Sequence, residues 1–394
     1  MSLASTDAKA PLDAKASPDA KVSPDAMQPQ GRLAVYDEPR GPFTVRLFPL
    51  RAVAPGEILA KVRMSTICRS DIHSWLGHRP NPCPGVLGHE IVGTIVELGA
   101  GVTHDMRGDA LAQGDRITWS EYFVRDADQV DLEVPQKSPS LAKYGHLAAA
   151  TPPHHHGGFG EYCYLLPKTW VLKVPAALSD EEAAPVNCGV ATMVCATERA
   201  RIGLGDRVVI QGLGLLGLYG AALAKARGAS EVVGIDPDAS RRERGLRFGC
   251  DHVLDPTSTI DDDLVVVVRA LCGGRGADAV IEVCGVPSVV ATGLRMLGHG
   301  GRFVLAGMVN PNAGATIDLG LVLRGLLTIE GVHNYHPRHL CEALDFVARW
   351  KSRFPFHELV DGHYALDDVE RAMRDADERR VVRAAVVPWS QRRA

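Results

Sequence analysis

Several signs of other protein classes are missing from this 394-residue sequence. It has no surplus of basic charge, because Lys and Arg number 43, Asp and Glu 47, and the net charge is −4. It has no apolar run long enough to span a bilayer, and its first residues, MSLASTDAKA, lack the apolar core of a secretory signal. These absences predict a cytoplasmic protein that binds neither nucleic acid nor membrane.

The sequence also lacks any Cys-x-x-Cys pair. Its nine cysteines are scattered and odd in number, which argues against a disulfide framework in a chain of this size. Most are interpreted as small, buried apolar residues, except where other metal ligands lie near them. They are Cys68, Cys83, Cys163, Cys188, Cys195, Cys250, Cys272, Cys284 and Cys341.

The residues that are present divide the sequence into four segments, and its length suits two domains better than one core. Residues 1–30 hold an imperfect repeat, LDAKASPDAKVSPDA, with almost nothing to bury, so we expect a disordered tail. In residues 31–188, short β-branched runs such as EIVGTIVELG are broken by Gly and Pro. This pattern predicts an irregular, mostly antiparallel β domain that begins near Leu33.

Residues 189–331 alternate apolar strand runs with helical stretches. DRVVIQG and EVVGID are typical of buried strands, and LLGLYGAALAKARG between them is typical of a helix that ends at Gly. This alternation predicts an α/β fold with a parallel, doubly wound sheet. Residues 332–394 contain one long helix, one short helix and a final strand, and we expect them to return to the β domain.

A glycine-rich loop follows the first of these strands and opens the helix. Gly212, Gly214 and Gly217 form a GxGxxG pattern, which is informative only in this context. The first glycine permits a tight turn, the second lets a pyrophosphate approach the backbone, and the third allows the helix to pack on the strand. The helix N-terminus favours an anion, so the loop predicts a dinucleotide site.

Asp236 ends the next strand, where a carboxylate accepts hydrogen bonds from an adenosine ribose and repels the 2′-phosphate of NADP. This position favours NAD over NADP. Arg241 and Arg242 weaken the preference, because a nearby Arg accommodates that phosphate. An alternative interpretation of Asp236 is a helix N-cap, with Pro237 at the first helical position.

Three potential metal ligands occur at separated places in the chain. Cys68 begins CRSDIH, His89 follows in GHE, and Cys188 lies in PVNCGVAT. Two thiolates and one imidazole form a plausible zinc set that leaves a fourth position for water or substrate, as in catalytic zinc sites. Each residue alone would be interpreted as a buried Cys or a loop His; together with the glycine loop they favour a metal site.

These motifs resemble the zinc-containing alcohol dehydrogenases of the medium-chain dehydrogenase/reductase superfamily, from about residue 33 to 390. The resemblance implies a Rossmann domain plus a GroES-like, mostly antiparallel catalytic domain. It implies an enzyme that transfers hydride between a small alcohol or carbonyl compound and NAD(H), with one catalytic zinc. A homodimer or homotetramer is the expected assembly.

The resemblance also implies roles for individual residues at the metal. Cys68, His89 and Cys188 match the zinc ligands of the family. Glu90 matches a carboxylate behind the metal, proposed as an exchanging ligand. Asp71 matches an acid that orients the ligand His, which agrees with how such outer residues act.

Four further positions match residues that handle the proton and the cofactor. Ser70 matches the hydroxyl that takes the substrate proton, and His73 the residue that passes it toward solvent. Arg69 and Arg383 match cationic contacts to the cofactor pyrophosphate. For Ser70, a turn serine is the alternative interpretation.

One stretch departs from the family. Many relatives hold a structural zinc with four cysteines spaced C-x₂-C-x₂-C-x₇-C, and here Val124, Ala127, Val130 and Ser138 occupy those positions. None is a thiol, so no structural zinc is predicted. The adjacent histidines 154–156 are interpreted as a solvated loop, because three neighbours do not easily face one ion.

Two stretches, PQKSPSLAKYGH and GVHNYHPRHL, look like a subgroup associated with phosphonate metabolism. This suggests a hydroxyalkyl-phosphonate or another anionic alcohol as the substrate, with the anion held by a cationic or imidazole side chain. The candidates are Arg338, His333 and His336 for the anion, and Trp75, Trp119 and His146 for the pocket wall.

Other functions stay open at this point. A quinone-reductase-like enzyme shares the fold but needs no zinc. Threonine and polyol dehydrogenases share the zinc, although polyol enzymes usually have Glu as the third ligand. A non-catalytic dinucleotide-binding module is a further alternative, against which Ser70 and His73 argue because a pure binder needs no proton relay.

Overall fold

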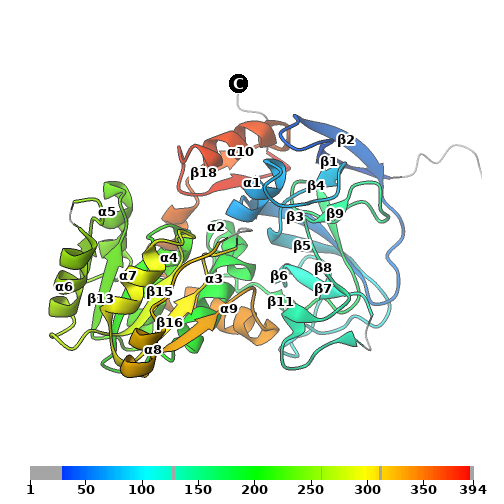
Figure 1. The fold of residues 1–394 in the computed structure, drawn as a ribbon. Helices are drawn as coiled ribbons and strands as arrows, with labels where there is room; N and C mark the ends of the chain where they lie inside the picture. The colour runs from blue at the N-terminus through cyan, green and yellow to red at the C-terminus, as the bar shows by residue number, and fades with distance from the viewer. Residues whose placement is uncertain (1–28, 127–128, 259, 310–312, 391–394) are drawn as a thin grey trace, which may run out of the picture.

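The computed structural model describes residues 29–126, 129–258, 260–309 and 313–390. They form two bodies side by side, one rich in β strands and one with helices around a sheet (Figure 1). The tail predicted for residues 1–30 lies outside the described residues except for its last two positions, and Gln30 begins strand β1 (Gln30–Tyr36). Among the described helices, none is long and apolar enough to cross a membrane.

The β-rich body is built on a sheet with strand order β11-β6-β5-β3-β19-β18, and β10 pairs with β3. The strands are Ile58–Thr66 (β3), Glu90–Leu98 (β5), Arg116–Trp119 (β6), Tyr162–Leu165 (β10), Val171–Lys173 (β11), Gly362–Tyr364 (β18) and Ala384–Val386 (β19). All neighbouring pairs are antiparallel except β18 with β19. The C-terminal part of the chain therefore completes the sheet of the β-rich body.

Two smaller sheets belong to the same body, with orders β2-β1-β4-β9 and β7-β8. Their further strands are Phe43–Pro49 (β2), Gly85–Val86 (β4), Tyr122–Val124 (β7), Leu141–Lys143 (β8) and Leu147–Ala148 (β9). A short 3-10 helix, η2 (Pro135–Lys137), lies in the connection from β7 to β8. Residues 122–143, with β7 and β8 at their ends, are called the lobe below.

The second body contains a parallel sheet with strand order β14-β13-β12-β15-β16-β17. The strands are Arg207–Gln211 (β12), Glu231–Ile235 (β13), His252–Leu254 (β14), Ala277–Glu282 (β15), Leu297–Leu305 (β16) and Thr328–Gly331 (β17). The chain runs outward in one direction from β12 to β14 and in the other from β15 to β17. The carboxyl ends of the neighbouring strands β12 and β15 therefore form the topological switch point, where such sheets bind ligands.

Helices cover both faces of this sheet (Figure 1). Alternate residues of a strand point to opposite faces, so Val208 and Ile210 of β12 pack with α3, α4 and α9, while Val209 packs with α6 and α7. The helices of the chain are Arg69–Trp75 (α1), Asp180–Ala183 (α2), Gly189–Arg199 (α3), Leu215–Ala226 (α4), Ala239–Arg247 (α5), Asp261–Leu271 (α6), Val289–Met296 (α7), Leu319–Gly325 (α8), Pro337–Trp350 (α9) and Val369–Asp377 (α10). The predicted fold class, a doubly wound parallel sheet plus a mostly antiparallel β domain, is confirmed.

One hydrophobic core runs through the junction of the two bodies. Met64 of β3 and Val92 of β5 belong to the same buried cluster as the inner faces of α3, α4 and α9. A shared core resists sliding of the bodies past each other. Residues near the junction, including the ends of β3 and β5, therefore hold fixed positions relative to the parallel sheet.

Candidate active site

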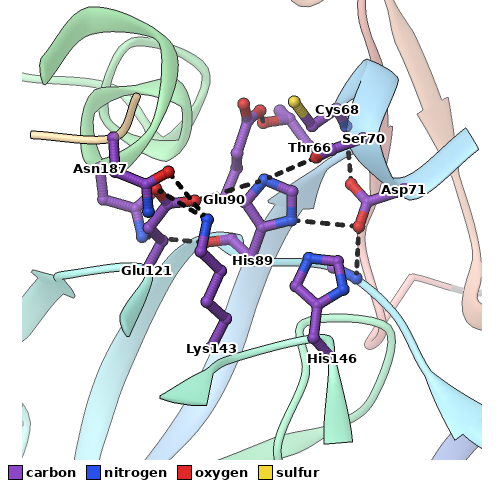
Figure 2. Close-up of polar contacts among 12 residues, drawn as sticks. Thr66, Cys68, Ser70, Asp71, His89, Glu90, Glu121, Lys143, His146 and Asn187 are labelled. Carbon is purple, nitrogen blue, oxygen red and sulfur yellow. Dashed lines mark hydrogen bonds and ion pairs between the residues drawn. The ribbon is translucent and has the colours of Figure 1, made fainter. Parts of the chain in front are cut away.

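Four side chains with metal-binding atoms converge at this junction. Cys68 precedes α1, His89 and Glu90 stand at the start of β5, and Cys188 precedes α3. Their ligand atoms all lie within 4.8 Å of one another, and in the described part of the chain they are the only such group of three or more. Figure 2 shows three of these residues with the polar contacts around them. The structure thus brings together the four residues predicted to form the metal site.

Asp71 links the two loops that carry Cys68 and His89. Its fully buried carboxylate accepts hydrogen bonds from Cys68 N at 2.8 Å, from Gly88 N at 3.1 Å and from His89 Nδ1 at 3.1 Å. Gly88 has a φ of 89°, and a Cβ there would lie 2.6 Å from Phe159. Because Nδ1 of His89 donates to Asp71, Nε2 is the nitrogen left to bind a metal.

Arg383 lies buried beside the cluster and forms an ion pair with Glu90. Its Nε donates to Glu90 Oε2 at 3.2 Å, and its second nitrogen donates to Oε1. The Thr66 hydroxyl also donates to Glu90 Oε2. Burial raises the pKa of Glu90, and the Arg383 guanidinium opposes that shift. Glu90 is therefore tied back to β3 and β19 at its carboxylate.

The chemistry of the donors fits zinc. A hydrogen bond from the Cys188 thiol holds the pKa of Cys68 well below its usual range, and the same contact raises the pKa of Cys188. Burial lowers the pKa of His89, but the Asp71 carboxylate and the Cys68 sulfur together outweigh it, so the net shift is upward. Two thiols and an imidazole suit zinc, whereas Mg²⁺ and Ca²⁺ prefer a set of oxygens.

Ser70 and His73 both belong to α1 but have different surroundings. Ser70 Oγ lies 3.4 Å from His89 Nε2, so its hydroxyl faces the metal cluster. His73 Nδ1 lies 3.4 Å from Nδ1 of His78 at an exposed position. Among the described residues, no hydrogen bond joins Ser70 to His73 directly. The predicted relay thus has its inner end at the cluster and its outer end near solvent.

A cavity of about 510 Å³ lies between the two bodies. Its walls include predicted cofactor-binding residues from both sides: Gly212, Gly214, Asp236 and Arg241 from the parallel-sheet body, and Arg69 and Arg383 from the β-rich body. Gly217 is not in the wall. The cavity lies over the carboxyl ends of β12 and β13, the place expected for a dinucleotide.

The three glycines of the loop have three different geometries. Gly212 has a φ of 100°, which side-chain-bearing residues rarely adopt. A Cβ on Gly214, the N-cap of α4, would meet nothing within 4 Å, so this position is open toward the cavity. A Cβ on Gly217 would lie 1.8 Å from Gly212 O, so only glycine lets α4 pack this closely. The turn at Gly212 and the close packing at Gly217 have the expected geometry, and the approach of a pyrophosphate to Gly214 stays a prediction.

Asp236 is 3% exposed and faces the glycine loop. Its carboxylate accepts hydrogen bonds from Leu213 N at 2.8 Å and from Asp238 N at 2.9 Å, and it lies 3.7 Å from Arg241. The N-cap of α5 is Asp238, whose side chain accepts from Arg241 N. The alternative interpretation of Asp236 as that N-cap is therefore wrong. Arg242 pairs instead with Asp255 at 3.0 Å.

Three arginines bring positive charge to the cavity wall from the β-rich side. Arg69 pairs with Asp377 of α10 at 2.8 Å and stays half exposed, and Arg383 pairs with Glu90. Arg379 is the third, and sequence reasoning missed it. It lies just after α10, with a φ of 59°. The only signal for it in the sequence is its place in the run ERR, just before the strand residues VVRAAVVPW, and this pattern is too common to single it out.

The lobe is held by backbone hydrogen bonds in its described part. Val124 is buried in β7, and Ser138 is buried with its hydroxyl accepting from Asp131 N at 3.0 Å. The Asp131 carboxylate accepts from Glu133 N and Val134 N, each at 2.9 Å. These contacts stand at or near positions where relatives carry cysteines; Ala127, another of those positions, lies outside the described residues.

The prediction of a solvated loop at histidines 154–156 is wrong. His155 and His156 are 0% and 2% exposed, because the loop folds under β1 and β10. His156 Nε2 contacts Thr151 O at 2.7 Å, whereas neither ring nitrogen of His155 has a partner among the described residues. Burial lowers the pKa of both histidines to about 4. Packing against neighbouring strands, invisible in a run of three polar residues, decides their environment.

The residues suggested for the substrate end up in different places. Arg338 pairs with Glu198 and Glu342, so its charge is already matched by two carboxylates. His336 caps α9 by accepting from Arg338 N at 3.1 Å. His333 contacts the ammonium group of Lys137.

Of the aromatic candidates for the pocket wall, only His146 lies at the metal cluster. Its ring stacks on that of His89, with centroids 5.7 Å apart. Trp119 is fully buried in the core of the β-rich body. Trp75 is buried and donates Nε1 to Gly41 O at 2.9 Å.

Sequence reasoning missed three polar residues around His89, visible in Figure 2. Glu121 Oε2 lies 3.9 Å from His89 Nε2, and Lys143 Nζ lies 3.7 Å from Glu121 Oε1. Asn187 Nδ2 donates to His89 O at 3.0 Å and to Trp119 O at 2.7 Å. No spacing rule joins positions this far apart, so only the folded chain reveals them.

Comparisons with known proteins agree with this arrangement. The family model described as alcohol dehydrogenase GroES-like domain matches residues 54–176, and the model described as zinc-binding dehydrogenase matches residues 216–349. The chain is 31% identical to L-threonine 3-dehydrogenase of Pyrococcus horikoshii over 75% of this chain and 80% of the relative. It is 27% identical to 5-exo-hydroxycamphor dehydrogenase of Pseudomonas putida over 82% and 90% of the two chains. An alcohol dehydrogenase structure from Thermotoga maritima superposes with a TM-score of 0.86 at 25% identity, covering 91% of this chain and 99% of that one.

Proposed function

The chain belongs to the zinc-type medium-chain alcohol dehydrogenases, and we propose that it is a zinc-dependent enzyme that transfers hydride between a small alcohol and NAD(H). The observation that carries this proposal is the place of the four-donor cluster. Cys68 and Glu90 stand next to Arg69 and Arg383, which line the same cavity as the glycine loop. The metal cluster therefore lies next to the wall of the cavity that the glycine loop lines.

Cys68, His89 and Cys188 are the residues that would hold the zinc, with Glu90 behind it. Bound zinc supplies Lewis acidity that lowers the pKa of an alcohol hydroxyl. Asp71 keeps the His89 ring oriented through its Nδ1, and Asn187 fixes the backbone carbonyl of the same residue. The protein therefore fixes the positions of the metal-binding side chains before a metal binds.

The proton and the cofactor are handled by other side chains. Ser70 Oγ, 3.4 Å from His89 Nε2, is the hydroxyl placed to accept the proton of the substrate. His73 stands where a proton can leave for solvent. Bound NAD supplies the hydride acceptor, and the glycine loop with Asp236 orients its adenosine and pyrophosphate. The buried carboxylate of Asp236 supports NAD rather than NADP.

A direct test measures zinc per chain by elemental analysis together with NAD-linked and NADP-linked oxidation of a panel of alcohols. Wild-type protein is expected to hold one zinc. Cys68→Ser should lose both the zinc and the activity, because a hydroxyl is a poor substitute for a thiolate ligand. Cys83→Ser, which changes an exposed cysteine outside the cluster, is the matched control.

The outcomes separate the alternatives. Turnover without zinc would favour a metal-free reductase, and binding of NAD without any turnover would favour a non-catalytic module. A second zinc per chain would show that the lobe has other metal ligands. Higher kcat/KM with NADP than with NAD would overturn the assignment to Asp236.

We also propose that the protein works as a homodimer in the cytoplasm. The free thiols of the cluster support a reducing compartment. Strand β17 pairs only with β16 in the described chain, and Leu319, Leu323 and Leu326 nearby are 76%, 75% and 75% exposed. An open strand edge beside exposed leucines is typical of a subunit contact.

Sedimentation velocity tests the assembly. Wild type is expected to sediment as a dimer, and Leu323→Asp should shift the population toward monomer because it places a charge in the contact. Leu132→Asp, at an 82% exposed position in the lobe, is the control. A wild-type monomer, or a dimer that Leu323→Asp leaves intact, would contradict this contact; a tetramer would require a second one.

A further inference from the structure

Charged and polar side chains from the lobe gather on one side of the metal cluster. Lys143, from β8, has a side chain that is only 13% exposed. Its Nζ donates to Asn334 Oδ1 at 3.0 Å and lies 3.7 Å from Glu121 Oε1. Lys137, from η2, contacts Nδ1 of His333. Two lysines of the lobe thus meet two residues that follow β17.

Asn334 adds a donor that nothing in the described chain satisfies. The residue is 7% exposed, and its Nδ2 has no hydrogen-bond partner there. A buried, unpaired donor is costly, so it marks a place where a ligand can bind. The φ of Asn334 is 60°, a conformation that asparagine adopts more readily than most residues.

The segment around Asn334 is anchored firmly to the metal site. Tyr335 O accepts a hydrogen bond from Tyr122 OH at 2.9 Å, and Tyr335 OH donates to Asn187 O. Asn187 in turn holds the carbonyl of His89. The amide of Asn334 therefore has a fixed position relative to the metal ligands.

The donors lie close to the cluster. Glu121 stands between Lys143 and His89. Its Oε1 lies 3.7 Å from Lys143 Nζ, and its Oε2 lies 3.9 Å from His89 Nε2. Figure 2 shows the Lys143 side chain reaching toward Glu121 on the same side of His89. A small molecule with its hydroxyl at the cluster can therefore place another group at the lysines.

The charge at these donors is not balanced. Glu121 is the one carboxylate within ion-pair distance of Lys143, and no ion pair joins Lys137 to a carboxylate among the described residues. Burial and the Lys143 ammonium lower the pKa of Lys137. Burial and the same two lysines lower the pKa of His333 to about 4, which leaves it a neutral acceptor. Two ammonium groups, of which only that of Lys143 lies within ion-pair distance of a described carboxylate, favour an additional anion.

We propose that Lys137, Lys143 and the side-chain amide of Asn334 bind an oxyanion of the substrate, which is then a small alcohol carrying a phosphonate, phosphate or carboxylate group. The proposal rests on the proposed function, because it places the hydroxyl of the same molecule at the metal cluster. The three residues come from the lobe and from the segment after β17. A bound substrate would therefore connect the lobe to the parallel-sheet body.

Direct binding tests this site without turnover. Inorganic phosphate, methylphosphonate and acetate are titrated calorimetrically into zinc-loaded protein, and the phosphorus anions are compared with the carboxylate to identify the anion class. Lys143→Gln and Asn334→Ala should weaken binding of the preferred anion by about tenfold to a hundredfold, the usual range for a hydrogen bond to a charged group. Lys143→Arg should retain most of the binding, and Lys168→Gln removes an exposed lysine outside the cluster as a matched control.

Kinetics supply the second measurement. The ratio of kcat/KM for 2-hydroxyethylphosphonate or 3-hydroxypropanoate to kcat/KM for 1-propanol should fall at least about tenfold in Lys143→Gln and stay at the wild-type value in Lys168→Gln. Comparing a charged with an uncharged alcohol separates anion binding from general damage to the fold.

The outcomes distinguish the two proposals. Wild-type protein that oxidises 1-propanol with NAD but binds none of the three anions would overturn the oxyanion site and leave the proposed function standing. Anion binding that Lys143→Gln weakens, in a protein without NAD-linked activity, would support the site and overturn the proposed function. An equal loss of anion binding in Lys143→Gln and Lys168→Gln would show that Lys137 and Lys143 have no specific role.

Discussion

The metal cluster and the lobe differ in what they bring together, because among the described residues only the cluster gathers metal-binding side chains. At the cluster, three loops present Cys68, His89 and Cys188 to a common point, and the Asp71 carboxylate holds the first two of these loops together. In the lobe, Asp131 and Ser138 bind backbone N–H groups, and β7 pairs with β8. In both regions a carboxylate accepts hydrogen bonds from backbone N–H groups, but a metal would order only the cluster loops through their side chains.

This difference shows how one chain can keep one metal site while another stretch does without thiols. Val124, Val130 and Ser138 stand where relatives carry lobe cysteines, and the described part of the lobe still forms a defined hairpin. The same lobe carries Lys137 in η2 and Lys143 in β8. The lobe is therefore available for contacts with the substrate rather than with an ion.

Removal of metal should separate the two regions most strongly. Treatment with EDTA is expected to lower NAD-linked activity at least about a thousandfold, because the Lewis acid is lost. Hydrogen exchange of the lobe amides should keep the rate measured before chelation, and added zinc should restore activity. Loss of protection in residues 129–143 on chelation would show that the lobe depends on a metal after all.

Asp71→Asn should weaken the cluster from behind. An amide in place of the carboxylate puts a donor against the N–H groups of Cys68, Gly88 or His89, so zinc affinity should fall about tenfold to a hundredfold. Competition with a zinc chelator measures the change. Asp109→Asn, at an exposed aspartate, is the control, and equal zinc affinity in both variants would contradict the role of Asp71.

Acid should also act on the loop next to the lobe, where two buried histidines have lowered pKa values. The pKa of His155 is about 4 in the folded protein and near 6.5 when unfolded, so the unfolded chain takes up the proton first. The stability present above pH 6.5 is thus lost as the pH falls toward 4. When the pH falls from 7 to 5, the unfolding free energy of wild type should drop by about 2 kcal/mol more than that of His155→Phe.

Urea unfolding at the two pH values measures this difference. His299→Gln, which changes an exposed histidine, should keep the acid sensitivity of wild type. Parallel curves for wild type and His155→Phe would mean that His155 is not what makes the fold sensitive to acid.

The smallest effect is expected in the lobe itself. Asp131→Ala removes the acceptor for Glu133 N and Val134 N, which should cost about 1 kcal/mol because water replaces part of the interaction. Amide exchange in the lobe should speed up accordingly, while zinc content stays at one per chain. Asp126→Ala is the control; a loss of zinc in Asp131→Ala would link the two regions in a way that their contacts do not suggest.

The sequence predicts best those features that depend on neighbours in the chain. Gly212, Gly214 and Gly217 occupy the backbone geometries that their spacing requires, and Asp71 reaches back to Cys68 across one helical turn. The four metal-site residues were found through the family motif. In each case, local structure or a known pattern carries the information.

The features that were missed or misjudged depend on distant partners. Lys143 meets Asn334 and Glu121 only after the lobe folds onto the segment that follows β17. Arg338 looks free in the sequence because its partner Glu198 stands on another helix. Histidines 154–156 look solvated until β1 and β10 cover them. Tertiary packing overrides local polarity at all these positions.

The insertion of β19 between β3 and β18 constrains how this chain is made. Thr66 pairs with Ala385, and Arg383, just before that strand, supplies the partner of Glu90. The ribosome synthesises the entire parallel-sheet body after β3 and before β19. That body can fold as soon as it emerges, because its six strands are contiguous in the sequence. Glu90 is synthesised long before Arg383, so its carboxylate lacks its counter-charge for much of synthesis.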